Sequence, residues 1–214
     1  MLAALAALTA AAAAPADSTL TAARAFADMP ISVLDILDRS TRLDMLDYAD
    51  ADSVLDARNL LEGTSRLTQL TPDYARVELT DVSSLQIKVL PYGKNDRIVM
   101  ALTTVGSPSQ AADTGIDFFD SSMRPLDASK LFREPKLADF FDIPRGSATT
   151  MREIEGMIPF PTYEITATPG SDDVTLTLTA GPNMDVDDYN IMKLFLRPGV
   201  VWRWTGKRFE PARK

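Results

Sequence analysis

The spacing of hydrophobic residues along the chain changes near residue 66 from a helical period to an extended one. Before this point, Leu34 and Leu37 lie three positions apart after Pro30, a residue that is favoured in the first turn of a helix. Leu43 and Leu46 repeat the same spacing. The pattern predicts two short helices in this part of the chain, the second of which ends near residue 50.

Beyond residue 66, apolar and polar positions alternate, as they do in strands that bury one face. The segment 85–89 shows this most clearly, because Gln86 and Lys88 separate three apolar residues and are expected on the polar face. Five strands are expected in succession, the first from residue 66 and the others at 75–79, 85–89, 97–105 and 115–120. The connections are short and rich in turn residues, which favours an antiparallel sheet.

The rest of the chain predicts a smaller unit of helices and hairpins. After a connector, the capping-box pattern Thr150-x-x-Glu153 opens a short helix. The elements expected after it are a hairpin of 163–168 and 174–180, a helix that ends near 196, and a hairpin of 200–204 and 208–210. Because helices and strands are grouped in blocks, the fold class is α+β rather than alternating βαβ.

We therefore expect short N-terminal helices on an antiparallel sheet of about five strands, followed by a helix-hairpin-helix-hairpin unit. The boundaries that this predicts are 1–16 for a leader, 17–127 for the helices and the antiparallel meander, 128–148 for the connector and 149–214 for the smaller unit. The smaller unit is expected to pack with the first as one domain. The alternative is two tandem α+β units, because Tyr74 and Tyr163 each stand 11 residues before an apolar strand residue.

The first 16 residues have the main features of a secretory signal peptide. The apolar run at 2–14 is shorter than the roughly 20 residues that a membrane-spanning helix needs. Ala14-Pro15-Ala16 places small residues at positions −3 and −1, so cleavage is expected after Ala16, with Asp17 first in the mature chain. We therefore expect a periplasmic or secreted protein without a transmembrane anchor.

The composition excludes several kinds of chemistry. The chain has 214 residues, with 22 basic and 30 acidic side chains, a net charge of −8, and neither Cys nor His. It therefore has no disulfide, no thiolate nucleophile, no Cys/His zinc site and no imidazole base. The acidic balance argues against nucleic acid as a partner.

The clearest local signal for ligand binding is the aromatic and basic segment 202–209. A two-residue turn at Gly206-Lys207 would set Trp204 opposite Phe209 and place Trp202 on the same face. Such a face, flanked by basic side chains, could stack on a sugar ring. The candidate ligand-binding residues are Trp202, Arg203, Trp204, Lys207 and Arg208. The alternative interpretation is that the rings belong to the hydrophobic core.

No other cluster identifies a catalytic, cofactor or metal site. Seven aspartates lie between residues 35 and 56, and carboxylates suit Ca²⁺, but the segment 50–56 has Leu55 where an EF-hand loop requires glycine. The chain has no Ser-x-x-Lys signature and no glycine-rich phosphate loop. We therefore expect no catalytic residue, no bound metal and no cofactor.

Five short motifs follow one another along the chain. They are Asp28-Met29-Pro30, 42–48, Leu70-Thr71-x-Asp73-Tyr74, Pro125-Leu126-Asp127 and Trp202-x-Trp204-x-Gly206-x-x-Phe209. In this order, over residues 26–210, the chain resembles a domain-of-unknown-function family of exported (periplasmic) proteins from Bacteroidetes. The resemblance implies a single exported domain without an assigned activity, and it supplies no catalytic residues. The chain departs from the family pattern in its alanine-rich leader without a basic n-region.

The resemblance also gives two short sequences a meaning. Asp17-Ser18-Thr19 and Asp52-Ser53-Val54 are similar to the Asp-(Ser/Thr)-apolar O-glycosylation sites of such bacteria. Ser18 and Ser53 are therefore candidate O-glycosylation sites.

Together these features predict an exported, non-catalytic module that binds a protein or glycan of the cell envelope. One alternative is a carboxylate-based hydrolase of envelope polysaccharide, for which two carboxylates should face each other across a cleft. Another is a carrier or chaperone for an apolar ligand, for which the fold should enclose an apolar cavity.

Overall fold

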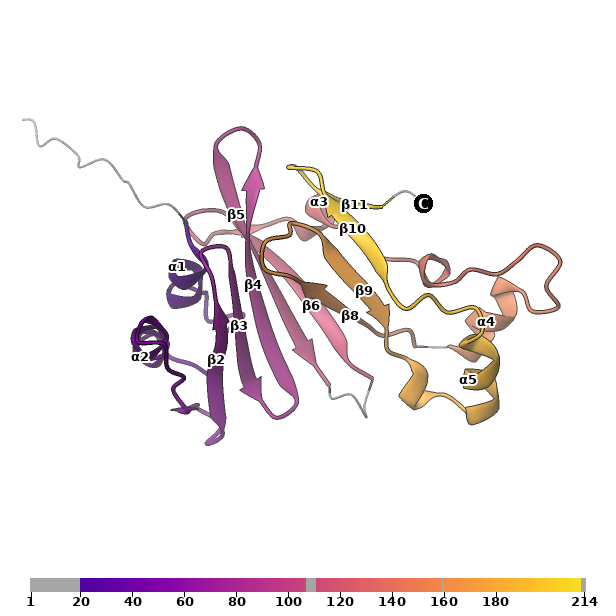
Figure 1. The fold of residues 1–214 in the computed structure, drawn as a ribbon, viewed down its shortest axis with the longest axis horizontal. Helices are drawn as coiled ribbons and strands as arrows, with labels where there is room; N and C mark the ends of the chain where they lie inside the picture. Colours follow the sequence, from indigo (N-terminus) through magenta and orange to yellow (C-terminus); the bar gives the residue numbers. More distant parts are fainter. Residues whose placement is uncertain (1–19, 107–110, 159, 213–214) are drawn as a thin grey trace, which may run out of the picture.

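The computed structural model describes residues 20–106, 111–158 and 160–212, and within these ranges the chain builds three layers (Figure 1). Helices α1 and α2 form the first layer and a seven-stranded antiparallel sheet the second. A four-stranded antiparallel sheet forms the third, with α4 and α5 at its far end. The strand orders are β1-β2-β3-β4-β5-β6-β7 and β11-β10-β9-β8, so within the described residues each paired strand is a neighbour in sequence.

The helices of the described residues are α1 (Ala22–Ala27), α2 (Arg39–Asp50), α3 (Ala128–Leu131), α4 (Met151–Met157) and α5 (Val186–Met192), with 3₁₀ turns η1 (Leu137–Phe140) and η2 (Gly181–Asn183). The large sheet comprises β1 (Ala57–Arg58), β2 (Thr64–Leu70), β3 (Tyr74–Thr80), β4 (Ser83–Tyr92), β5 (Asp96–Val105), β6 (Asp113–Phe119) and β7 (Pro125–Leu126). The small sheet comprises β8 (Tyr163–Ala167), β9 (Val174–Leu178), β10 (Val200–Trp204) and β11 (Phe209–Pro211).

The fold class predicted from the sequence is confirmed, including the helix-hairpin-helix-hairpin order of the C-terminal part. Among the described residues the large sheet has seven strands rather than about five, because β1 and β7 border it and are only two residues long. Strands of two residues are too short to show the alternation of apolar and polar positions by which strands are predicted. The first predicted helix was wrong in position: α1 ends before Pro30, and Leu34 and Leu37 are buried in the turns that follow.

One face of the large sheet is covered by α1 and α2. The capping side chains Thr21 and Asp38 accept hydrogen bonds from backbone N–H groups in the first turns, which satisfies donors that the helices leave free. Buried Arg42 links the two helices, because its Nη1 donates to the carbonyl oxygens of Phe26 and Met29 at 3.0 and 2.8 Å. The two helices thereby close one hydrophobic cluster over strands β2 to β6.

The other face of the large sheet is mainly polar on β2 and β3 and mainly apolar on β5 and β6. The small sheet covers its apolar part, where Met100, Leu102 and Phe118 join Leu176 and Trp202 in a second hydrophobic cluster. The remaining part, on β2, β3 and the start of β4, carries polar side chains and is not covered in this way.

Gln86 and Lys88 correct the expectation that β4 exposes its polar face. Both side chains are 1% exposed, because β8 of the small sheet crosses directly over them. Lys88 Nζ lies 2.5 Å from Asp73 Oδ2 and also donates to the carbonyl oxygen of Thr168 at 3.3 Å. The alternation in the sequence correctly predicted a strand, but the polar face of this strand is buried by a segment almost 80 residues further along the chain.

The polar side chains under β8 satisfy the backbone of this edge strand. The N–H groups of Ile165 and Ala167 donate to Thr114 Oγ1 and Gln86 Oε1, both at 3.1 Å. Gln86 Nε2 donates to the carbonyl oxygen of Ile165 at 3.3 Å, and Tyr163 N–H points to Asp113 Oδ1 at 3.4 Å. Buried backbone groups must find partners, so these contacts determine where the small sheet sits on the large one.

The C-terminal hairpin has the predicted register. Trp204 pairs with Phe209, and their ring centroids lie 4.9 Å apart. Gly206 has a φ of +82°, a value that glycine adopts readily in the two-residue turn. Trp202 is 1% exposed and its ring centroid lies 5.0 Å from that of Phe132.

Candidate functional site

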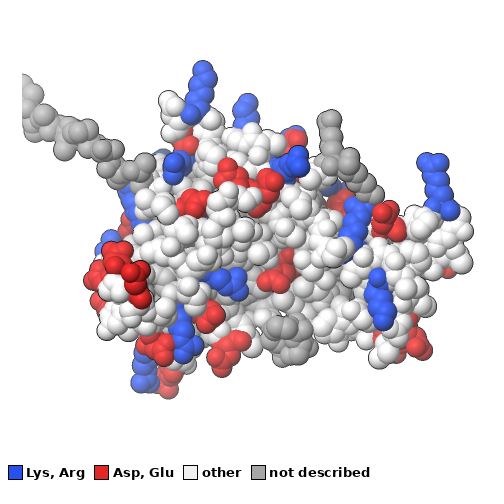
Figure 2. Space-filling view, in the orientation of Figure 1, with Lys and Arg blue, Asp and Glu red and all other residues white. Residues whose placement is uncertain are grey.

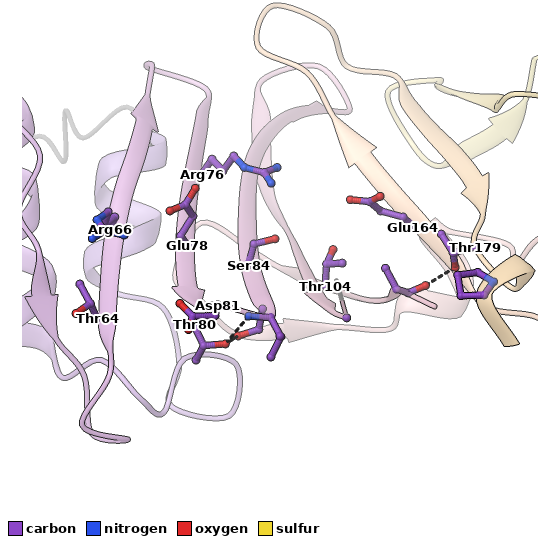
Figure 3. Close-up of a pocket in the computed structure, with 15 residues that line it drawn as sticks. Thr64, Arg66, Arg76, Glu78, Thr80, Asp81, Ser84, Thr104, Glu164 and Thr179 are labelled. Atoms are coloured by element: carbon purple, nitrogen blue, oxygen red, sulfur yellow. Dashed lines mark hydrogen bonds between the residues drawn. The ribbon is translucent and has the colours of Figure 1, made fainter. Parts of the chain in front are cut away.

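A pocket of about 560 Å³ lies where the polar part of the large sheet meets the edge of the small one (Figure 3). Strands β2, β3 and β4 form its floor, and Glu164 on β8 and Thr179 after β9 form the opposite wall. The turn between β3 and β4 closes one end with Asp81 and Val82. Figure 2 shows side chains of both charges in the middle of this face, and mainly acidic ones at the end formed by α2.

Strand register brings the floor residues together in rows. Arg66 pairs with Glu78, Glu78 with Ser84, and Ser84 with Thr104, so one polar row runs across four strands. In the next row, Arg76 pairs with Gln86, which is already under β8. The pocket is therefore the part of the polar surface that the small sheet leaves open.

The two arginines of the floor differ in their partners. Arg66 forms a two-point ion pair with Asp56, through its Nε and, at 3.2 Å, through its Nη2. This hydrogen bond from Arg66 lowers the pKa of Asp56. Arg76, by contrast, forms no ion pair with any residue that the structure describes, and its guanidinium extends between Glu78 and Glu164 (Figure 3). The pocket thus contains one cationic group that has no ion-pair partner among the described residues.

Arg76 is connected to the buried polar network under β8. Burial raises the pKa of the Tyr74 hydroxyl, and the neighbouring Arg76 guanidinium partly opposes this effect. The same Tyr74 hydroxyl donates to Gln86 Oε1 at 3.2 Å. A ligand group that binds Arg76 would therefore lie next to Tyr74 and Gln86, the residues that connect the large sheet to β8.

Hydroxyl groups supply most of the remaining polar surface. Thr80 and Ser83 share a hydrogen bond of 2.7 Å at the closed end, Ser84 lies on the floor, and Thr104 lies next to it on β5. Among the described residues that line the pocket, none is aromatic. The site therefore offers charged and hydrogen-bonding groups but no ring for stacking.

The family of the chain follows from comparison with known protein families. Residues 17–209 match the family described as "Protein of unknown function (DUF3256)". The chain belongs to this family. The resemblance stated from the sequence motifs is thereby confirmed, and DUF3256 carries no assigned activity.

A solved structure shares the fold of this DUF3256 domain. It is the "Structure of a domain of an uncharacterized protein from Porphyromonas gingivalis W83", with a TM-score of 0.74 and 23% sequence identity. The similarity covers 90% of this chain and 98% of that one. No curated protein matches the chain. The comparisons establish a family and a fold, both without an assigned activity.

The residues predicted to bind a ligand at the C-terminus do not line the pocket between the sheets. Trp202 is buried, and Trp204 is partly buried, with its Nε1 donating to the carbonyl oxygen of Pro91 at 2.6 Å. Arg203, Lys207 and Arg208 are exposed. A binding role for this group stays a prediction.

The other predicted features lie elsewhere on the DUF3256 domain. Ser53 is exposed in the loop after α2, whereas the proposed leader and Ser18 lie outside the described residues. In the described part of the chain, no three acidic side chains form a group that could hold a metal ion. None of the helices within the described residues has the length and hydrophobicity to cross a bilayer.

Sequence reasoning did not identify the pocket residues. Arg76 and Glu78 looked like the solvent-facing positions of an ordinary strand, and Glu164 belonged to a separate hairpin. Only the register of β2 to β4 and the crossing of β8 bring them together. A partial signal was present, since two opposite charges two residues apart on a strand face the same side.

Proposed function

We propose that this chain is an exported, non-catalytic module that binds a protein or glycan of the cell envelope through the pocket between its two sheets. The observation that carries the proposal is Arg76, a partly buried cation without an ion-pair partner among the described residues, set between two carboxylates. Unpaired charges in a concave surface are well suited to bind a polar ligand with high specificity.

The pocket supports binding more strongly than the two alternatives. Charged and hydroxyl groups line it, which an apolar cargo would not match. A hydrolase would use Glu78 and Glu164, which lie on opposite walls. However, Glu78 is exposed and Glu164 is only partly buried, and polar side chains line the pocket around both, whereas the general acid of a glycosidase lies in an apolar environment.

Retention on the cell envelope tests this proposal. The wild-type mature chain is expected to be retained by a cell-envelope fraction of the bacterium that makes it, and the double variant Arg76→Gln, Glu164→Gln about 10-fold less, because two charged hydrogen-bonding groups are lost. Arg97→Gln is the matched control, since Arg97 is an exposed arginine of β5 outside the pocket.

Two results would contradict the proposal. Equal retention of the double variant and the wild type would exclude the pocket as the binding site. Release of soluble sugars from the envelope by the wild type, abolished by Glu164→Gln alone, would instead establish the hydrolase.

Export and glycosylation are tested together by intact mass. Protein isolated from its native cells is expected to begin at Asp17 and to carry additional mass at Ser53, which Ser53→Ala should remove. Added mass that persists in Ser53→Ala and disappears in Ser18→Ala would place the glycan in the segment after the cleavage site. A native protein that still contains residues 2–16 would contradict export through this leader.

A further inference from the structure

We infer that the pocket takes an extended, net-basic polypeptide segment of a partner protein, with an acidic side chain on Arg76 and basic side chains on Glu78 and Glu164. This inference rests on the proposed function and narrows its ligand from an envelope protein or glycan to a peptide of stated charge. Three observations support it: the net charge of the pocket, the spacing of its charges and the chemistry of its lining.

The charge of the pocket is negative once internal pairing is considered. Its lining includes two arginines and three acidic side chains, Glu78, Asp81 and Glu164. Arg66 is paired with Asp56, which lies outside the lining, so Arg76 is the one cation without an ion pair among the described lining residues, which include three carboxylates. A polyanionic glycan would meet repulsion here, whereas a segment with more basic than acidic groups is attracted.

The spacing of the charges matches an extended chain. Arg76 and Glu78 are two residues apart on β3, so their side chains leave the same face of the strand about 6.6 Å apart. A bound peptide in extended conformation presents every second side chain at the same interval. An acidic residue two positions from a basic one therefore meets Arg76 and Glu78 at once, and Glu164 on the opposite wall takes a second basic group.

The lining favours a peptide over a sugar chain. No described residue of the pocket carries a ring on which a sugar could stack, while hydroxyl groups of Thr64, Thr80 and Ser84 provide donors and acceptors for a peptide backbone. The peptide would bind through side chains rather than by adding a strand to β8, because the outward N–H groups of Ile165 and Ala167 are already bonded.

Binding of synthetic peptides to the mature chain tests the inference. The probes are three capped seven-residue peptides with Thr at odd positions and, at the even positions, Lys-Asp-Lys, Asp-Lys-Asp or Gln-Gln-Gln. The Lys-Asp-Lys peptide is expected to bind at least about 10-fold more tightly than either of the others at low salt, and its affinity should fall as salt is raised. Fluorescence anisotropy of the labelled peptides measures each dissociation constant.

Charge reversal separates recognition from damage to the fold. The triple variant Arg76→Glu, Glu78→Lys, Glu164→Lys inverts all three charges that contact the peptide and is expected to reverse the preference between the Lys-Asp-Lys and Asp-Lys-Asp peptides. Arg97→Glu should leave all three affinities unchanged. Thermal unfolding of each variant confirms that it remains folded.

The outcomes distinguish this inference from the proposed function. If the pocket variants lose envelope retention but no peptide is preferred over another, the peptide inference is wrong while the binding function stands. Retention that survives protease treatment of the envelope would likewise overturn the peptide in favour of a glycan. If the envelope retains wild type and pocket variants equally, the proposed site itself fails.

Discussion

Replacing Trp202 with alanine is expected to lower the free energy of unfolding by about 3–5 kcal/mol. The side chain is 1% exposed and stands at the centre of the cluster between the two sheets, with the Arg133 guanidinium 5.0 Å from its ring centroid. Removing it deletes a large apolar surface and leaves a cavity that the neighbouring Phe132 cannot fill without moving. Denaturant-induced unfolding, with the slope compared to wild type, measures the loss.

Trp204 provides the matched comparison. It is only partly buried, although it contacts Tyr92 and Phe209 at centroid distances of 6.4 and 4.9 Å. Trp204→Ala should therefore be clearly less destabilising than Trp202→Ala. An unchanged unfolding midpoint for Trp202→Ala would contradict the placement of this ring in the core. A loss of glycan binding without a loss of stability would instead support the ligand-binding interpretation of segment 202–209.

Replacing Asp73 with asparagine is expected to cost about 3–5 kcal/mol of stability, because it leaves the Lys88 ammonium group buried without its counter-charge. Lys88 is 1% exposed, and Asp73 is its only ion-pair partner among the described residues. Lys88→Met should cost less, since the Asp73 side chain is 34% exposed and can be solvated when the lysine is gone. Unfolding curves of the two variants at neutral pH test this order. Equal or reversed costs would contradict it.

The same pair gives the stability a defined dependence on pH. Partial burial raises the pKa of Asp73, but the hydrogen bonds from Lys88 and Thr71 act in the opposite direction and together hold it below its ordinary value. A carboxyl group whose pKa is lower in the folded state contributes stability above its unfolded pKa, near about 4, and loses it as pH falls through the folded value. The gap in stability between wild type and Asp73→Asn should therefore shrink in acid. A gap that widened below pH 4 would contradict this assignment.

The sequence indicated the longer strands and the order of the C-terminal helices and hairpins, but not the short border strands, the position of the first helix or the contacts between the two sheets. Alternation along 85–89 indicated a strand, and the Gly206-Lys207 turn set the register of Trp204 against Phe209, because both signals are local. The burial of Gln86 and Lys88 was not predictable from this pattern, since it depends on β8, which lies far along the chain. Polar residues on one face of a strand usually show that this face is exposed to solvent. Here the polar face is buried, and its side chains form hydrogen bonds with the backbone of the second sheet.

The candidate site could not be predicted from local sequence patterns for the same reason. Arg76 and Glu78 have no distinctive neighbours in sequence, and their importance lies in what the small sheet leaves uncovered. The aromatic residues concentrated in segment 202–209 suggested a binding surface, but Trp202 packs in the hydrophobic cluster between the two sheets. Residue type was thus enough to suggest a core position for Trp202. The pocket, by contrast, is formed by strand register and by the packing of the two sheets, which local sequence does not show.

The saturation of the β8 edge also affects how copies of this protein behave when they are crowded together. An open strand edge presents rows of amide donors and acceptors to any other chain and is a common starting point for aggregation. Here Ile165 and Ala167 direct their amides into side chains of their own molecule, so a second copy meets no unbonded donor at these two positions. An apolar replacement of Gln86 would leave the amide of Ala167 and the carbonyl of Ile165 without their partner, so the contact between the sheets should weaken and the edge of β8 should open to other molecules more often.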